Sequence, residues 1–97
     1  MTVEILPIIR HAKVMGVFAR PPEVKEMFKA LPVNSPLTFE EEPTNPHDKY
    51  AVKILAGGTF IGYVPKEMSA SIGLFDSQKL IGMYHSNGEF SVGVFAE

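Results

Sequence analysis

The sequence has 97 residues, of which 45% are hydrophobic, a composition ordinary for one small globular domain. Nine basic and eleven acidic side chains give a formal net charge of −2, which excludes a polybasic, histone-like tail. The absence of cysteine excludes disulfides, a thiol nucleophile and cysteine-ligated metal. We expect a single domain over residues 1–97. Residues 2–9 are too few to span a bilayer and lack the basic segment of a signal peptide, so we expect a cytoplasmic protein without membrane contact.

The predicted elements begin with two strands. Residues 3–9 form the first, and Pro7 marks an edge strand or a bend because proline cannot donate to a ladder. Residues 13–18 form the second, and Gly16 marks a bulge or a close approach of backbone.

A helix is predicted over residues 23–31. Pro22 suits its first turn, and Pro32 stops it. Apolar residues recur with helical spacing, which predicts one face docked on the sheet; they are Val24, Met27, Phe28 and Leu31.

The middle of the chain predicts three further strands around one irregular loop. Residues 36–41 alternate as a half-buried strand, and the two prolines of residues 42–48 exclude regular structure there. Residues 49–55 and 59–64 form a hairpin about Gly57-Gly58. Tyr50, Val52 and Ile54 share one face of the first of these two strands.

The last third predicts a helix and a hairpin. Pro65 opens the helix. Residues 80–85 and 89–95 flank Asn87-Gly88, a strong signal for a two-residue turn. The helix stripe is Met68, Ile72 and Phe75, and the inward residues of the hairpin are Phe90, Val92 and Val94.

These elements predict a mainly β, β-rich α+β fold with about six strands and two short helices. Short strands joined by turns favour an antiparallel sheet. Curling that sheet into a small barrel buries one face and removes exposed edges.

No catalytic or metal-binding motif is present. The sequence lacks a nucleophile elbow, a phosphate-binding loop, a dinucleotide fingerprint and a zinc-binding helix. Its histidines, His11, His47 and His85, do not have the spacing of metal ligands. Glu40 and Glu42 share one strand face, which favours a charged sheet edge over an acid–base pair. We therefore expect no enzyme activity, no metal and no cofactor.

One ordered set of short motifs is more specific. It comprises Glu42-Pro43, Asn45-Pro46, Asp48, Ala51-Val52, Gly62-Tyr63 and Val64-Pro65, with a weaker opening segment Val14-Met15-Gly16-Val17. In these residues the sequence resembles the HIRAN domain family. The resemblance implies a modified OB-type barrel that binds DNA without catalysis. In the best-understood member, the domain captures the free 3′-hydroxyl end of single-stranded DNA during repair or replication.

The resemblance also implies which side chains make the site. Asp48 is the candidate acceptor for the 3′-hydroxyl, and Lys66 is the candidate phosphate contact, with Lys49 assisting. His47 and Tyr63 are candidates to line the pocket. Phe18 or Arg20 takes the stacking position of the opening strand. The implied partners are single-stranded DNA ends and a helicase or nuclease.

Several alternatives stay open at this point. His47 stands where the family usually has tyrosine, and residues 40–42 are acidic, which opposes phosphate binding. The alternative function is a protein-interaction module that docks on a DNA-processing enzyme. Asp48 has a second interpretation, in which its carboxylate bonds nearby backbone amides and shapes the loop. Gly62 is expected to allow close packing rather than ligand approach.

Overall fold

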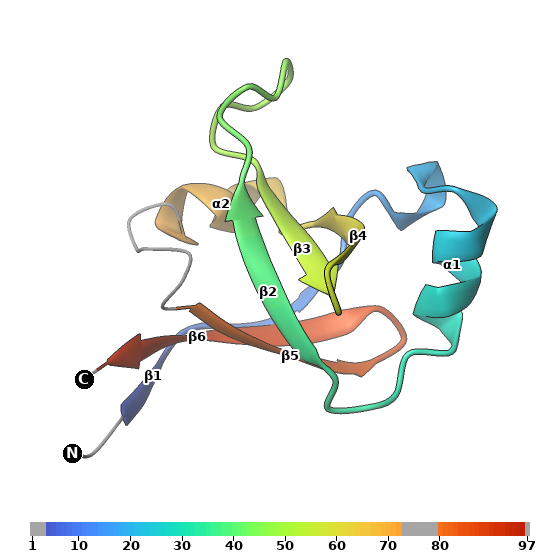
Figure 1. Ribbon diagram of the computed structural model, residues 1–97. Coiled ribbons are helices and arrows are strands. Elements are labelled where there is room, and N and C mark those ends of the chain that lie inside the picture. The colour runs from blue at the N-terminus through green and yellow to red at the C-terminus, as the bar shows by residue number, and fades with distance from the viewer. Residues whose placement is uncertain (1–3, 73–79, 97) are drawn as a thin grey trace.

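The computed structural model describes residues 4–72 and 80–96, and within them it contains six strands, two α-helices and one 3-10 turn. The elements are β1 (Glu4–Lys13), η1 (Val17–Ala19), α1 (Pro22–Lys29), β2 (Pro36–Glu41), β3 (Val52–Ala56), β4 (Thr59–Tyr63), α2 (Lys66–Ile72), β5 (Leu80–Ser86) and β6 (Glu89–Ala96). The strands form one antiparallel sheet in the order β1-β6-β5-β2-β3-β4, curled into a half-barrel (Figure 1). This arrangement confirms the predicted β-rich architecture.

The two edge strands of the sheet meet just beyond β1. The backbone N–H of Met15 donates to the Tyr63 carbonyl at 2.8 Å, and the N–H of Tyr63 donates back to the Met15 carbonyl at 2.7 Å. Gly62 permits this approach, because a Cβ there would lie 2.5 Å from both the Met15 carbonyl oxygen and Val14 Cγ1. The expectation that Gly62 serves close packing is therefore confirmed.

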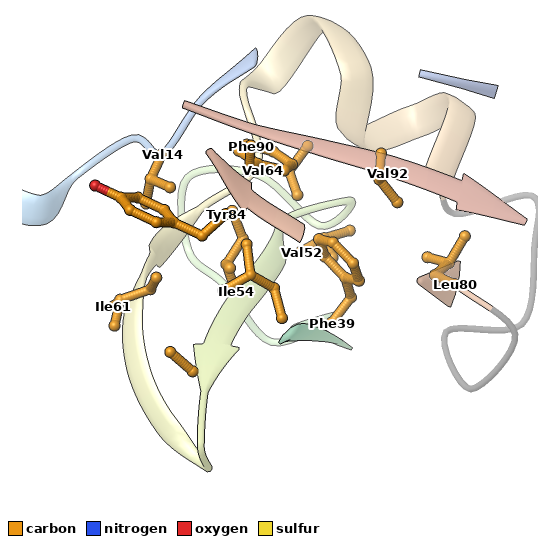
Figure 2. Close-up of a cluster of buried hydrophobic side chains, with 12 residues drawn as sticks. Val14, Phe39, Val52, Ile54, Ile61, Val64, Leu80, Tyr84, Phe90 and Val92 are labelled. Atoms are coloured by element: carbon orange, nitrogen blue, oxygen red, sulfur yellow. The ribbon is translucent and has the colours of Figure 1, made fainter. Parts of the chain in front are cut away.

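The core lies on the concave face of the sheet, as Figure 2 shows. Its most deeply buried apolar side chains are Val52, Ile54, Ile61 and Phe90, each with no exposed surface. The predicted helix stripe of Val24, Met27, Phe28 and Leu31 packs against this core. Phe28 meets the ring of Tyr84 edge-on, with 5.6 Å between the ring centroids. Helix α1 ends at Lys29 rather than at Leu31, because a residue before proline is disfavoured in helical conformation.

Other predicted elements are confirmed closely. Strand β2 has the predicted bounds, and β1 is irregular after Pro7, as expected of an edge. Two-residue turns join β3 to β4 and β5 to β6, with φ of +58° and +84° at Gly57-Gly58 and +52° and +80° at Asn87-Gly88. Phe90 and Val92 point inward. The expectations for the side chains of Ile72, Phe75 and Val94 lie outside the described residues.

Three predictions are wrong. Residues 13–18 do not form a strand: β1 ends at Lys13, and Gly16 has a φ of +77°, which starts the turn η1. Tyr50 is 54% exposed and precedes β3, because the turn of residues 48–51 displaces it from the strand. Glu42 is not a solvated carboxylate of a strand edge: β2 ends at Glu41, and the Glu42 side chain is 24% exposed and bonded by Asn45 and Tyr63. Glu40, beyond the last β2–β5 pair at Leu37, is 59% exposed, as a charged edge residue would be.

Candidate nucleic-acid interface

The connection from β2 to β3, residues 42–51, is called here the 42–51 loop. It leaves the sheet beside the start of α2, where Figure 1 draws it as the green-to-yellow segment above β2 and β3. At its base, the Glu42 N–H donates to the Ala51 carbonyl at 2.8 Å, and the Ala51 N–H donates to the Asp48 carbonyl at 3.0 Å. The loop is therefore closed at its neck by backbone hydrogen bonds.

Asn45 organises the tip of the 42–51 loop. Its Oδ1 accepts hydrogen bonds from the backbone N–H of His47 at 2.8 Å and of Asp48 at 3.0 Å. Its Nδ2 donates to Glu42 Oε1 at 2.7 Å. An asparagine that caps the amides two and three residues ahead makes a tight turn that mimics a backbone turn. Asn45 therefore fixes the direction in which His47 and Asp48 leave the loop.

Asp48 joins the loop to the first turn of α2. Its Oδ1 accepts the Tyr50 N–H at 2.9 Å, so Asp48 does bond a nearby backbone amide, as its second interpretation expects. Its Oδ2 lies 3.4 Å from the hydroxyl of Ser69, which is 1% exposed and also lies 2.9 Å from the Lys66 carbonyl oxygen. Asp48 and the start of α2 are thus on the same side of the molecule.

The Glu42 carboxylate is shared by three neighbours. Its Oε1 accepts hydrogen bonds from Asn45 Nδ2 and, at 2.9 Å, from the Tyr63 hydroxyl, while Oε2 lies 3.7 Å from Lys53 Nζ. Lys53 also lies 3.8 Å from Glu40. The hydrogen bond from Asn45 is the main cause that holds the pKa of Glu42 below its usual range. Burial, followed by the bond to Glu42, raises the pKa of Tyr63.

An aromatic and cationic cluster continues from Tyr63 across β4. The Phe60 ring meets Tyr63 edge-on at a centroid distance of 5.1 Å. The guanidinium of Arg20 lies 4.1 Å from the Phe60 centroid, and Lys53 Nζ lies 5.4 Å from it. These are distances of cation–π contacts. Phe18, on η1, is 83% exposed.

The predicted site residues divide into two groups. Arg20, Tyr63, His47 and Asp48 are linked by a chain of contacts through Phe60, Glu42 and Asn45. Lys66 is exposed at the start of α2, which Asp48 contacts through Ser69. Lys49 lies apart with its Nζ 5.1 Å from the ring of Tyr50, and Phe18 stands open to solvent two residues before Arg20.

Sequence reasoning missed four members of this network as site residues: Glu42, Asn45, Phe60 and Ser69. The Asn-Pro motif was a usable signal for Asn45, because asparagine at such a position caps the following amides. The contacts of Glu42 with Tyr63 and of Asp48 with Ser69 each join residues 21 positions apart. No local pattern in the sequence carries those contacts.

The sequence profile of the HIRAN domain matches residues 15–85, which include the loop, β4 and the first turn of α2. The chain belongs to the HIRAN domain family. HIRAN domains are binding domains, and DNA binding is the function generally associated with the family. No curated protein matches the sequence.

Two crystal structures share the HIRAN fold of this chain. One is a protein from Lactobacillus plantarum, with a TM-score of 0.82 and 13% identity over 99% of this chain and 100% of that one. The other is the HIRAN domain of human HLTF, with a TM-score of 0.74 and 17% identity over 98% of this chain and 80% of that one. At these identities the likeness concerns the fold alone.

Two further features bear on partners. Within residues 4–72 and 80–96, every helix is too short or too polar to cross a membrane. The same residues hold no group of three or more histidine, aspartate or glutamate side chains placed to bind a metal ion.

Proposed function

We propose that this HIRAN domain is a non-catalytic module that binds the 3′-hydroxyl end of single-stranded DNA in repair or replication. The observation that carries the proposal is the position of Asp48, which an Asn45-capped loop holds against the first turn of α2. That turn begins with Lys66. A cytoplasmic location and a helicase or nuclease as protein partner belong to the same proposal.

Asp48 has the chemistry to accept a hydroxyl. A carboxylate has about four lone-pair sites. The Tyr50 N–H occupies one of them on Oδ1, while the single hydroxyl hydrogen of Ser69 is shared between Asp48 Oδ2 at 3.4 Å and the nearer Lys66 carbonyl oxygen at 2.9 Å. Capacity for a further donor therefore remains. A 3′-phosphate at the same place would be repelled by the like charge of the carboxylate. Lys66 would contact the preceding phosphate, with Lys49 assisting.

Stacking would supply affinity without reading sequence. His47 is exposed at the loop tip, and Phe18 is exposed on η1, so both rings are open to a base. Each base stacked on an aromatic side chain contributes about 1–3 kcal/mol. Tyr63 is half-buried with its hydroxyl held by Glu42, and Arg20 covers Phe60, so these two would form the wall of the site.

The direct experiment is fluorescence anisotropy with short single-stranded oligonucleotides that end in a 3′-hydroxyl or a 3′-phosphate. Asp48→Asn keeps an oxygen for the Tyr50 amide but removes the charge. Since a hydrogen bond to a charged group contributes about 1.5–3 kcal/mol, we expect the preference for the hydroxyl end to fall about tenfold or more. Lys66→Ala should weaken both ends alike.

The matched controls are Glu26→Gln and Lys29→Ala, which change the same charges at exposed positions on α1. Both should bind like the wild type. Absence of binding to either oligonucleotide, or an unchanged end preference in Asp48→Asn, would contradict the proposal.

The second candidate function is docking on a DNA-processing enzyme. The observation in its favour is the exposed apolar surface of η1 and the segment before it, where Phe18 is 83% and Met15 50% exposed. A partner that stays bound after nuclease treatment and is lost in Phe18→Ser would favour this function over DNA-end binding.

A further inference from the structure

Glu42 is the point at which the 42–51 loop is tied to the sheet. Its carboxylate receives Asn45 from the loop, Tyr63 from β4 and Lys53 from β3. The Glu42 side chain is 24% exposed, so these contacts are partly shielded from water. We propose that Glu42 is a positioning residue, which acts through Asn45 and Tyr63 to hold the 42–51 loop in the conformation that presents His47 and Asp48.

The side-chain amide of Asn45 is bonded at both its oxygen and its nitrogen. Its oxygen accepts the His47 and Asp48 N–H groups, and its nitrogen donates to Glu42 Oε1. The orientation of the amide is thereby fixed chiefly by Glu42 at 2.7 Å, with the Tyr63 hydroxyl as a longer second acceptor at 3.5 Å. A rotation that broke the bond to Glu42 would also move the acceptor that directs the two loop amides.

Glu42 is itself bonded to β4 at the residue that closes the half-barrel. The Tyr63 hydroxyl that bonds it belongs to the residue at which β4 meets Met15. The Tyr63 ring also lies against Phe60 and near Gly16, whose added Cβ would stand 3.6 Å from Tyr63 Cδ2. The loop conformation is thus coupled to the closure of the half-barrel.

The negative charge of Glu42 strengthens some of its contacts more than others. Lys53 contacts Glu42 Oε2 at 3.7 Å and Glu40 at 3.8 Å, distances at which partly exposed ion pairs stabilise weakly. The hydrogen bonds to Oε1 are shorter, at 2.7 Å from Asn45 and 2.9 Å from Tyr63, and are strengthened by the charge of the acceptor. These two bonds, rather than the ion pair, therefore carry the positioning effect.

Two variants remove different hydrogen bonds of Glu42 and leave Asp48 unchanged. Asn45→Asp keeps an oxygen for the His47 and Asp48 amides but puts a carboxylate oxygen opposite Glu42 in place of the donating nitrogen. Tyr63→Phe removes the hydroxyl and keeps the ring against Phe60. The matched control is Tyr84→Phe, which also removes one tyrosine hydroxyl, the acceptor of the Gly88 N–H in the β5–β6 hairpin.

The first measurement is amide hydrogen exchange at His47, Asp48 and Tyr50, read by NMR in the full chain. Tyr63→Phe removes the bond of the hydroxyl to Glu42 and the longer contact from Asn45 Nδ2 at 3.5 Å. A loss of about 1 kcal/mol corresponds to about a fivefold faster exchange. Asn45→Asp should have a larger effect, because repulsion is added to the loss. Tyr84→Phe should leave the three rates unchanged. Wild-type rates in both loop variants would overturn the proposal.

The second measurement is the ratio of affinities for 3′-hydroxyl and 3′-phosphate oligonucleotides; this part rests on the proposed function. We expect the ratio to fall in Asn45→Asp and Tyr63→Phe and to be largely retained in Glu42→Gln, whose Oε1 can still accept both bonds. Faster exchange with an unchanged ratio would overturn the positioning role. If the wild type shows no end preference, the proposed function fails, and the exchange rates alone decide whether Glu42 positions the loop.

Discussion

The two connections that flank β3 are stabilised in different ways. The Gly57-Gly58 turn joins β3 to β4 with two residues of positive φ, and an added Cβ at either glycine would meet nothing within 4 Å. The 42–51 loop joins β2 to β3 and is held by side chains of Glu42, Asn45 and Asp48. The conformation of the turn is determined by its own two glycines, whereas that of the 42–51 loop depends on side-chain contacts with β4 and α2.

In this fold, one connection sets the strand register and the other holds side chains toward solvent. A two-residue turn fixes which strand residues face each other and needs only the correct backbone angles. A longer connection with an asparagine cap and an anchored carboxylate can instead hold a side chain at a chosen place. Changes at the Met15–Tyr63 bridge, at the Gly57-Gly58 turn and in the charge of Glu42 separate these two roles, with effects that decrease in that order.

The largest effect is expected from Gly62→Ala. The new methyl group would lie 2.5 Å from the Met15 carbonyl and from Val14, and backbone cannot move aside as a flexible side chain can. Overpacking of this kind lowers the free energy of unfolding by about 3 kcal/mol. Urea unfolding followed by circular dichroism measures the loss.

This substitution should also disturb the loop, because it pushes Met15 away from Tyr63. Amide shifts at His47 and Asp48 should change while those of Gly57 and Gly58 stay as in the wild type. A variant of unchanged stability would show that the Met15–Tyr63 bridge is not needed to close the sheet.

A smaller effect is expected from Gly58→Ala. The φ of this residue is +84°, a region that costs an L-residue about 1 kcal/mol, and the added methyl group meets open space. The free energy of unfolding should fall by that amount, measured by urea unfolding. Exchange at His47 and Asp48, compared at equal stability, should not change. Faster exchange at His47 and Asp48 would show that the conformation of the 42–51 loop depends on that of the Gly57-Gly58 turn.

The smallest effect is expected from pH. The pKa of Glu42 is lowered from its usual 4.5, chiefly by Asn45, so its contribution to stability is present above 4.5 and is lost as the pH falls through the folded-state value. The pKa of Tyr63 is raised from 10.0, so its contribution is present below 10.0 and is lost as the pH rises through its folded-state value.

A pair of variants isolates the acid limb of this dependence. Urea unfolding between pH 3 and pH 6 should show a wild type more stable than Glu42→Gln near pH 6, with the difference closing as the pH falls. Glu41→Gln changes the same charge at the neighbouring exposed residue and should show no such closing gap. A gap of constant size in Glu42→Gln would contradict the assigned role of its charge.

The sequence predicts those parts of the fold that local rules determine. Strand β2 and both two-residue turns follow from alternation and from glycine at positive φ. The sequence wrongly predicts a strand at residues 13–18, because its apolar pattern also fits one bridging residue followed by a turn. Only the contact of Met15 with Tyr63, 48 positions later, decides between the two.

The same limit applies to the candidate site. The Asn-Pro loop and its Asp48 could be found from motif order, and the structure places them beside α2. The role of Glu42 as their anchor could not be predicted. In the sequence it is one of three consecutive glutamates, and only the tertiary contact with the Tyr63 hydroxyl distinguishes it. The role of a side chain set by a partner on another strand is a property of the tertiary structure.

The seam between β1 and β6 bears on the order in which the domain assembles. It pairs Glu4 with Ala96, near the two ends of the chain, and continues to Lys13 and Glu89. Contacts between such distant residues form slowly, because the intervening chain must first lose its freedom. We therefore expect the local hairpins β3–β4 and β5–β6 to form early. Pairing of β1 with β6 should come last and set the refolding rate.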